Sequence, residues 1–253
     1  MASARTAVLA ALVCSGCGVA DSSWGPAETV VENRKLDPGG TVSIENQNGS
    51  VRVEGWDQGS VRIEAEKRAR GGASLEAIRV EISGEGDRLD VMTRLPRRWP
   101  FGQSGSVRYT VMVPRGAHLK VTTANGGVEV QGMAGPVRAS TVNGSVTVLD
   151  ASGRVEASTV NGGIRASFRA TGDDSHSFST TNGSVAVTLP QGVSGAFEAR
   201  TTNGSIKTDF PLTVRGGAGG KRLEGRLGEG NARFEMRTVN GSVRIEKEPG
   251  SQS

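Results

Sequence analysis

The chain has 253 residues, with 30 Lys or Arg against 26 Asp or Glu, so its formal net charge of +4 is small and mixed. That balance does not by itself indicate a nucleic-acid-binding protein. Only 4% of the residues are aromatic and 37 are glycine. We therefore expect a turn-rich folded chain whose interior is built from Val, Ile, Ala and Thr, because a narrow interior has no room for larger side chains.

The first 16 residues are typical of an export signal, with a positive Arg5, an apolar stretch over 6–13 and a small-residue ending. Cys17 follows Ser15-Gly16, which resembles a bacterial lipoprotein signal and predicts lipidation of Cys17. Gly18 in place of Asp favours the outer membrane. Simple cleavage, with release to the periplasm or the exterior, is the alternative. Residues 17–40 are then expected to be a flexible tether.

An internal repeat organises the rest of the chain, and we place its domain at 41–247, with a disordered tail at 248–253. The repeat is Asn-Gly, then Gly or Ser, then Val or Ile, and six of its seven copies carry Thr two places before the asparagine. Its asparagines are Asn48, Asn125, Asn143, Asn161, Asn182, Asn203 and Asn240.

Residues alternate around each copy: Val137, Ala139 and Thr141 would face one way and Arg138 and Ser140 the other, which predicts strands with one buried face. We expect almost no helix. Asn-Gly tolerates positive φ and so could close antiparallel hairpins. Recurrence of the same residue types at one register favours a single-stranded parallel β-helix (β-solenoid), in which each Asn-Gly is a left-handed corner. An antiparallel β meander or sandwich is the alternative. The 37 residues between Asn203 and Asn240 would hold two coils.

Three segments match a known family in order along the chain: Gly55-Trp56-Asp57, then 107–117 leading into 119–128, then 227–230 leading into 237–245. Together they resemble the bacterial family labelled "putative adhesin", a domain of unknown function found on exported and envelope proteins. The resemblance covers about residues 41–247. It implies a single-chain β-helix and brings no catalytic residues with it.

Candidate contact residues come from the position four places after each repeat asparagine, where the bases are Arg52, Arg165, Lys207 and Arg244 and the one acid is Glu129. Stacked corners would align these bases into an outward ribbon that could hold an anionic polymer; outward arginines can equally keep a strand surface soluble. Arg97, Arg98 and Trp99 combine charge with an aromatic ring, as contact sites do, or fold over one end as a cap.

We expect no enzyme, catalytic residue, metal or cofactor. No acidic row is expected among the coils, which disfavours a glycoside hydrolase or lyase. Asp173, Asp174 and His176 lie together in sequence but are read as a solvated inter-coil turn. The predicted function is a non-enzymatic cell-envelope protein that displays a β-solenoid surface to an envelope polysaccharide or a protein, without nucleic acid, and with the membrane reached only through a lipid anchor. A β-helix carbohydrate-active enzyme and a passive structural or signalling ectodomain are the alternatives.

Overall fold

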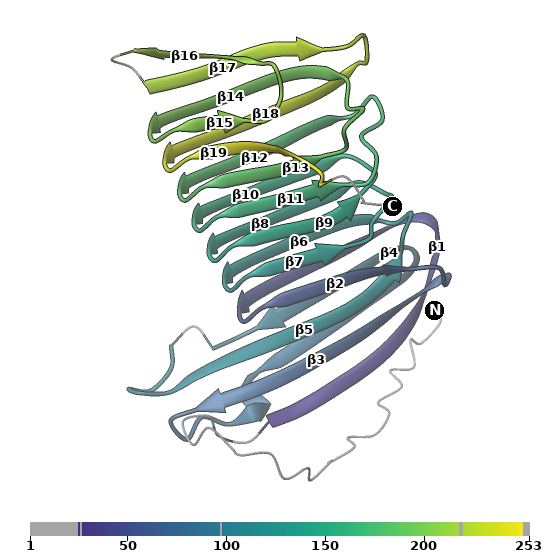
Figure 1. Cartoon of the computed structure of the whole chain (residues 1–253). Coiled ribbons are helices and arrows are strands. Elements are labelled where there is room, and N and C mark those ends of the chain that lie inside the picture. The colour runs from purple at the N-terminus through teal and green to yellow at the C-terminus, as the bar shows by residue number, and fades with distance from the viewer. Residues whose placement is uncertain (1–24, 26, 97, 218–219, 250–253) are drawn as a thin grey trace.

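The computed structural model describes residues 25, 27–96, 98–217 and 220–249. These residues form 19 strands and one short 3-10 turn, η1 (Leu75–Ala77), with no α-helix among them, so the predicted all-β class is confirmed. None of the described segments is a helix long and apolar enough to cross a membrane. The strands build two facing sheets, which we call sheet A and sheet B, and together they form a tall column (Figure 1).

Parallel coils form the middle of the column, each with one strand in sheet B and one in sheet A (Figure 1). The sheet B strands are β6 (His118–Asn125), β8 (Val137–Asn143), β10 (Val155–Asn161) and β12 (Ser175–Asn182). The sheet A strands are β7 (Val128–Gln131), β9 (Val146–Ala151), β11 (Ile164–Phe168) and β13 (Val185–Leu189). Each strand pairs in parallel with its counterpart in the next coil. The fold is therefore solenoid-like and mostly parallel, and the antiparallel meander is wrong for this part.

The N-terminal end adds antiparallel strands to the column. β1 (Ala27–Asn48) serves both sheets: residues 27–35 pair antiparallel with β3 (Ser60–Arg70), and residues 41–48 lie parallel between β4 (Arg79–Arg94) and β6. β2 (Val51–Trp56) lies parallel between β5 (Ser104–Pro114) and β7, and β5 runs antiparallel to β3. The tether predicted at 17–40 is wrong over 27–40, because these residues are strand; residues 17–24 and 26 lie outside the described residues.

Spatial order departs from chain order at the C-terminal end. β18 (Ala232–Asn240) and β19 (Val243–Lys247) form a coil between the β12–β13 coil and the coil of β14 (Gly195–Asn203) and β15 (Ile206–Thr208). β17 (Gly220–Leu227) then pairs antiparallel with both β14 and β16 (Thr213–Gly217). The long spacing before Asn240 thus holds a hairpin, not the extra coil that we expected. Of the predicted tail, Glu248 donates its N–H to the Leu189 carbonyl at 2.8 Å, and 250–253 lie outside the described residues.

Alternating side chains meet between the sheets and form one core, which is mainly Val, Ile and Ala. The expectation that this interior excludes large side chains is wrong, since it also holds Tyr109 and a group of stacked rings. Tyr109 is fully buried, shares a 2.7 Å hydrogen bond with the Thr93 hydroxyl, and has its pKa raised to about 12 by burial. The buried rings in the C-terminal half are Phe168, His176, Phe178, Phe197, Phe210 and Phe234.

His176 belongs to this ring group and not to a turn, so its predicted place in an inter-coil loop is wrong. It lies in β12, is 1% exposed, and stacks on Phe234 with ring centroids 4.7 Å apart. Its Nδ1 accepts the Val155 N–H at 3.3 Å. The described residues contain no group of His, Cys, Asp and Glu side chains suited to a metal ion. Its neighbours therefore give His176 a role in packing.

Candidate binding surface

The seven repeat asparagines form one column at the strand ends of sheet B, and each pairs in register with the next. Their side-chain amides make a continuous ladder of six hydrogen bonds of 2.8–2.9 Å, each running from Nδ2 of one asparagine to Oδ1 of the one before. The spatial order is Asn48, Asn125, Asn143, Asn161, Asn182, Asn240 and Asn203. We call this set the asparagine column.

The glycine after each asparagine is required by close stacking of the backbone. A Cβ on Gly162 would lie 2.0 Å from the carbonyl oxygen of Gly144, and the other six repeat glycines give similar distances of 1.8–2.2 Å. Asp150 is the sole non-glycine residue with a positive φ in the described part of the chain. Positive φ therefore occurs at none of the repeat asparagines, and among the repeat glycines at Gly49, Gly126 and Gly183. The motif selects glycine mainly because neighbouring coils approach so closely.

The predicted basic row does form one register row on sheet A, but it is not a continuous ribbon. In space it runs Arg52, Glu129, Thr147, Arg165, Ala186, Arg244 and Lys207. Arg52 is ion-paired with Glu129 at 3.1 Å, and Arg165 has Thr147 and Ala186 as row neighbours. Only Arg244 and Lys207 are adjacent bases. Apart from this pair, the positive charges of the row are therefore separated by neutral or acidic residues.

The second predicted group does not join this row. Arg97 lies outside the described residues, and Arg98 is exposed. Trp99 is partly buried and packs against the core, close to Gly105. Phe101, two residues later, is fully exposed.

A polar groove lies beside the first coil. At this place β3 and β5 continue past the end of β2 (Figure 1). It consists of two adjoining hollows of about 400 and 410 Å³ that share Ser50 and Arg108. Its polar side chains are Asn48, Ser50, Arg52, Glu66, Arg68, Ser104, Ser106, Arg108, Thr110, Asn125, Glu129, Ser145 and Thr147. We call this the first-coil groove; of the predicted contact residues it contains only Arg52.

Hydrogen bonds from side-chain amides to backbone carbonyls join the first coil to β5 at this groove. The side chain of Asn46 donates to the carbonyl oxygens of Gly49 and Val107 at 3.0 and 2.8 Å, and so ties the first coil to β5. The Asn48 amide donates to the Gly105 carbonyl at 3.3 Å. These contacts hold β5 beside the first Asn-Gly pair and leave the outer polar side chains of β5 facing the hollow.

The charges in the first-coil groove are largely compensated. Arg52 pairs with Glu129, and Glu66 accepts from both Arg108 at 3.1 Å and Arg68 at 2.6 Å. Three guanidinium groups thus face two carboxylates, among eight hydroxyl and amide side chains. Such a surface offers many hydrogen-bond donors and acceptors and little net field.

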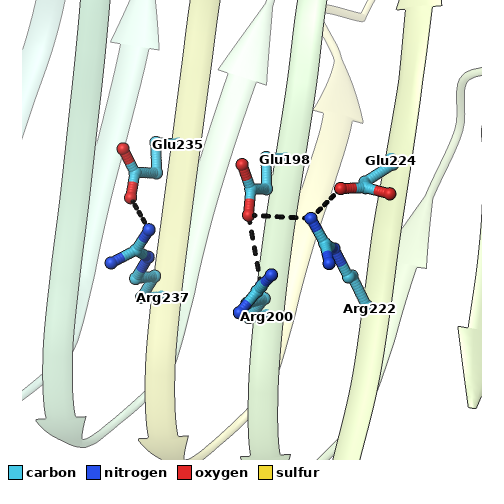
Figure 2. Close-up of polar contacts among 6 residues, drawn as sticks. All are labelled: Glu198, Arg200, Arg222, Glu224, Glu235 and Arg237. Carbon is cyan, nitrogen blue, oxygen red and sulfur yellow. Dashed lines mark hydrogen bonds and ion pairs between the residues drawn. The ribbon is translucent and has the colours of Figure 1, made fainter.

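A second polar surface lies on sheet B near its C-terminal end, and sequence reasoning missed it. Glu235, Glu198 and Glu224 occupy one row of adjacent strands (Figure 2). The next row contains Arg237, Arg200, Arg222 and Arg215. The row predicted on sheet A holds one acid, as expected, whereas this row on sheet B was not considered from the sequence. The signal was present as Glu-x-Arg in β14 and β18 and Arg-x-Glu in β17, but it aligns only in the spatial order of the strands.

These two charged rows neutralise each other. Arg222 contacts Glu198 at 3.4 Å and also Glu224, Arg200 contacts Glu198 at 3.1 Å, and Arg237 contacts Glu235 (Figure 2). All these side chains are substantially exposed, and exposed ion pairs of this kind contribute about 0–1 kcal/mol each. The rows therefore keep the outer face of sheet B soluble, while the hollowed surface lies at the other end of the column.

Three solved structures resemble this fold. A "putative cell adhesion protein" from Clostridium sporogenes has 13% identity and a TM-score of 0.43 over 87% of this chain and 100% of its own. A "putative adhesin" from Bacteroides fragilis has 10% identity and a TM-score of 0.37 over 86% and 96%. One from Parabacteroides merdae has 8% identity and a TM-score of 0.33 over 87% and 96%.

No curated protein matches the chain. A family model does match it, over residues 35–246, and begins six residues before the domain start that we expected at 41. This extension agrees with the second part of β1 belonging to sheet B. The chain therefore belongs to the Toastrack family, DUF4097.

Proposed function

We propose that this protein is an exported, non-enzymatic, adhesin-like protein that binds an envelope polysaccharide in the first-coil groove. The observation that carries the proposal is the groove itself, with its two joined hollows and its lining of amides, hydroxyls and compensated ion pairs. The similar structures are themselves called a putative cell adhesion protein and a putative adhesin, names that agree with a surface role.

The groove favours a neutral or zwitterionic polysaccharide over a strongly anionic one. Sugar hydroxyl groups both donate and accept hydrogen bonds, and the Asn, Ser, Thr, Arg and Glu side chains of the groove supply both kinds of partner. Because Glu66 and Glu129 offset the arginines, summed positive charge contributes little to binding there. A volume of about 400 Å³ in each hollow suits single sugar units of a longer chain.

Anchoring and architecture complete the proposal. Lipidation at Cys17 would attach the protein to the outer membrane through its N-terminus, and mass spectrometry of the mature N-terminus tests this. The asparagine column supports the finer proposal that each Asn-Gly is a corner of a single-chain parallel β-helix.

A matched set of arginine variants tests the site. We expect Arg108→Ala and Arg52→Ala to weaken retention on purified envelope polysaccharide about tenfold each, because each removes a charge-assisted hydrogen-bond donor from the groove. Arg165→Ala is the control, since Arg165 is exposed in the same row as Arg52 but lies outside both hollows.

The outcomes separate the groove from its alternatives. Equal weakening by all three variants, with strong dependence on salt, would indicate a summed field along the row. No retention of the wild-type protein on any envelope polysaccharide would overturn the polysaccharide proposal and favour a protein partner.

A further inference from the structure

Asn-Gly is a chemically reactive dipeptide, and this chain carries seven copies of it. The glycine backbone nitrogen can attack Cγ of the asparagine side chain, because glycine has no Cβ to obstruct the approach. A C–N bond then forms, the Cγ–Nδ2 bond breaks, and the glycine N–H proton is passed through solvent to the departing NH2 group, which leaves as ammonia. Water opens the resulting succinimide ring to aspartate or isoaspartate. The net change consumes one water and releases one ammonia, with no oxidant or reductant.

Six of the seven glycine nitrogens are held away from this reaction. Each donates its N–H to the main-chain carbonyl of the next asparagine in the column, at 2.7–3.0 Å, as Gly183 does to Asn240. The six donors are Gly49, Gly126, Gly144, Gly162, Gly183 and Gly241, and all are partly buried. Attack would require each to break a backbone hydrogen bond first.

Gly204 is the exception because its coil is the last in the column. Its neighbour on the outer side is β17, whose pairing with β14 ends at Thr201 opposite Lys221. The N–H of Gly204 has no acceptor among the residues that the structure describes, and Gly204 is exposed. The side chain of Asn203 donates to Asn240 at 2.9 Å, but its own Oδ1 has no donor within the described part of the chain.

We propose that Asn203 is a site of spontaneous deamidation in the folded protein, while the other six Asn-Gly sites are protected. The product alters the end of the asparagine column. An aspartate at this position cannot donate to Oδ1 of Asn240 and sets a negative oxygen against it, so the last rung of the ladder is lost. The terminal coil of β14 and β15 then becomes easier to open than before. This inference is independent of the first-coil groove.

The chain supplies a matched internal control. Asn182 and Asn203 both lie in the sequence Thr-Thr-Asn-Gly-Ser, so their local chemistry is the same. They differ in position within the column, because the Gly183 N–H donates to Asn240 whereas the Gly204 N–H has no such partner in the described residues. Any difference in rate between them in the folded protein therefore reports the fold.

Peptide mapping by mass spectrometry tests the proposal. The full chain is incubated at mildly alkaline pH, folded or in urea, and the conversion of each asparagine to acid is followed over time. In the folded protein we expect Asn203 to convert at least about tenfold faster than Asn182. A tenfold difference corresponds to the free energy of about one backbone hydrogen bond. In urea the two rates should be equal, and Asn203→Gln should remove the fast signal.

Two results would overturn the proposal. One is equal conversion of Asn182 and Asn203 in the folded protein. The other is a folded Asn203 that stays intact over the time in which the urea-treated chain converts. The consequence is tested separately with Asn203→Asp, which should increase hydrogen exchange in β14 and β15 and leave β8 and β10 unchanged; unchanged exchange in β14 and β15 would refute the loss of the last rung.

Discussion

The middle coils and the two ends of the column use the same residue types under different conditions. In the middle, each repeat asparagine has another asparagine above and below: the Asn161 amide donates to Asn143 and accepts from Asn182. At the ends one of those partners is missing. The first coil replaces the repeat threonine with Asn46, and the last coil is followed by an antiparallel hairpin. Repetition therefore gives the polar groups of backbone and side chains a hydrogen-bond partner only where a further coil follows.

This comparison explains why the described hollows, the reactive Asn-Gly and the antiparallel strands all lie near the ends. Antiparallel strands cover an edge without repeating the Asn-Gly motif, so β3 pairs with β5 beyond the asparagine column, and the β14–β17 pairing ends at Thr201. Where β3 and β5 run past that column, the first-coil groove opens. Beyond the last β14–β17 pair, the Gly204 N–H has no acceptor among the described residues.

The largest expected effect comes from a methyl group placed between two middle coils. Gly162→Ala would set a Cβ 2.0 Å from the Gly144 carbonyl oxygen, a backbone atom that cannot rotate away. We expect the free energy of unfolding to fall by about 4 kcal/mol, measured by chemical denaturation. Gly59→Ala is the control, because its Cβ meets no atom within 4 Å, and it should change stability by less than about 1 kcal/mol. A Gly162→Ala protein as stable as the control would contradict the close approach of the coils.

The second effect is a loss of stability in acid that depends on His176. Burial lowers the pKa of His176 to about 4, although the Thr171 carbonyl and Asp174 act in the opposite direction. The native state therefore binds fewer protons than the unfolded state between pH 6.5 and 4, so stability is full above pH 6.5 and falls towards pH 4. The expected loss over this window is about 3 kcal/mol.

A variant isolates the histidine from the carboxylates that also titrate in acid. His176→Phe keeps a ring against Phe168 and Phe234 and removes the titrating group. The difference between the stability curves of wild-type and variant proteins should follow the window above. Parallel curves from pH 7 to 4 would show that His176 is not buried as a neutral base.

The third effect compares a middle rung of the asparagine column with its last rung. Asn161→Ala removes two side-chain hydrogen bonds and Asn203→Ala removes one. At about 1 kcal/mol for each bond, we expect losses of about 2 and about 1 kcal/mol in chemical denaturation. Equal losses would mean that the ladder does not contribute bond by bond.

The period of the sequence predicted the features that recur in each coil, but it did not predict those that occur only once. Strands that alternate inward and outward, and the stacking of like residues, follow from the repeat alone, as Val137–Val155 pairing shows. Spatial order could not be read from the chain, because β18 and β19 insert before β14 and nothing in their local sequence differs from a sequential coil. The Glu198 and Glu235 row was hidden for that reason.

The aromatic core and the groove were missed for different physical reasons. Alternation places His176, Phe234 and Phe197 inward, but their stacking depends on which strands are neighbours. The groove depends on how far β5 extends past Asn48, which is a property of the antiparallel β3–β5 pair and not of any repeat residue. Arg52 was found from the repeat, whereas Arg108 and Glu66 lie outside it.

The smallest expected change in the free energy of unfolding has opposite signs at two threonines that hold the same position in the repeat. In the middle, the hydroxyl of Thr159 donates to the Gly144 carbonyl at 2.8 Å, and four other repeat threonines make the same bond. Thr123 is equally buried, but its Oγ1 has no hydrogen-bond partner among the residues that the structure describes. The Gly49 carbonyl that it would reach is occupied by the Asn46 amide at 3.0 Å.

Replacing each threonine by valine keeps the shape and removes the hydroxyl. Thr159→Val should cost about 1 kcal/mol, because it leaves the Gly144 carbonyl without that donor, whereas Thr123→Val should add up to about 1 kcal/mol, because a buried hydroxyl without a partner is unfavourable. Both are measured as shifts of the denaturation midpoint at constant slope. Shifts of the same sign would contradict the difference in hydrogen bonding between the Thr123 and Thr159 hydroxyls. Opposite shifts would show that Asn46, which ties the first coil to β5 and so opens the groove, does this at the expense of one hydrogen bond in the coil above.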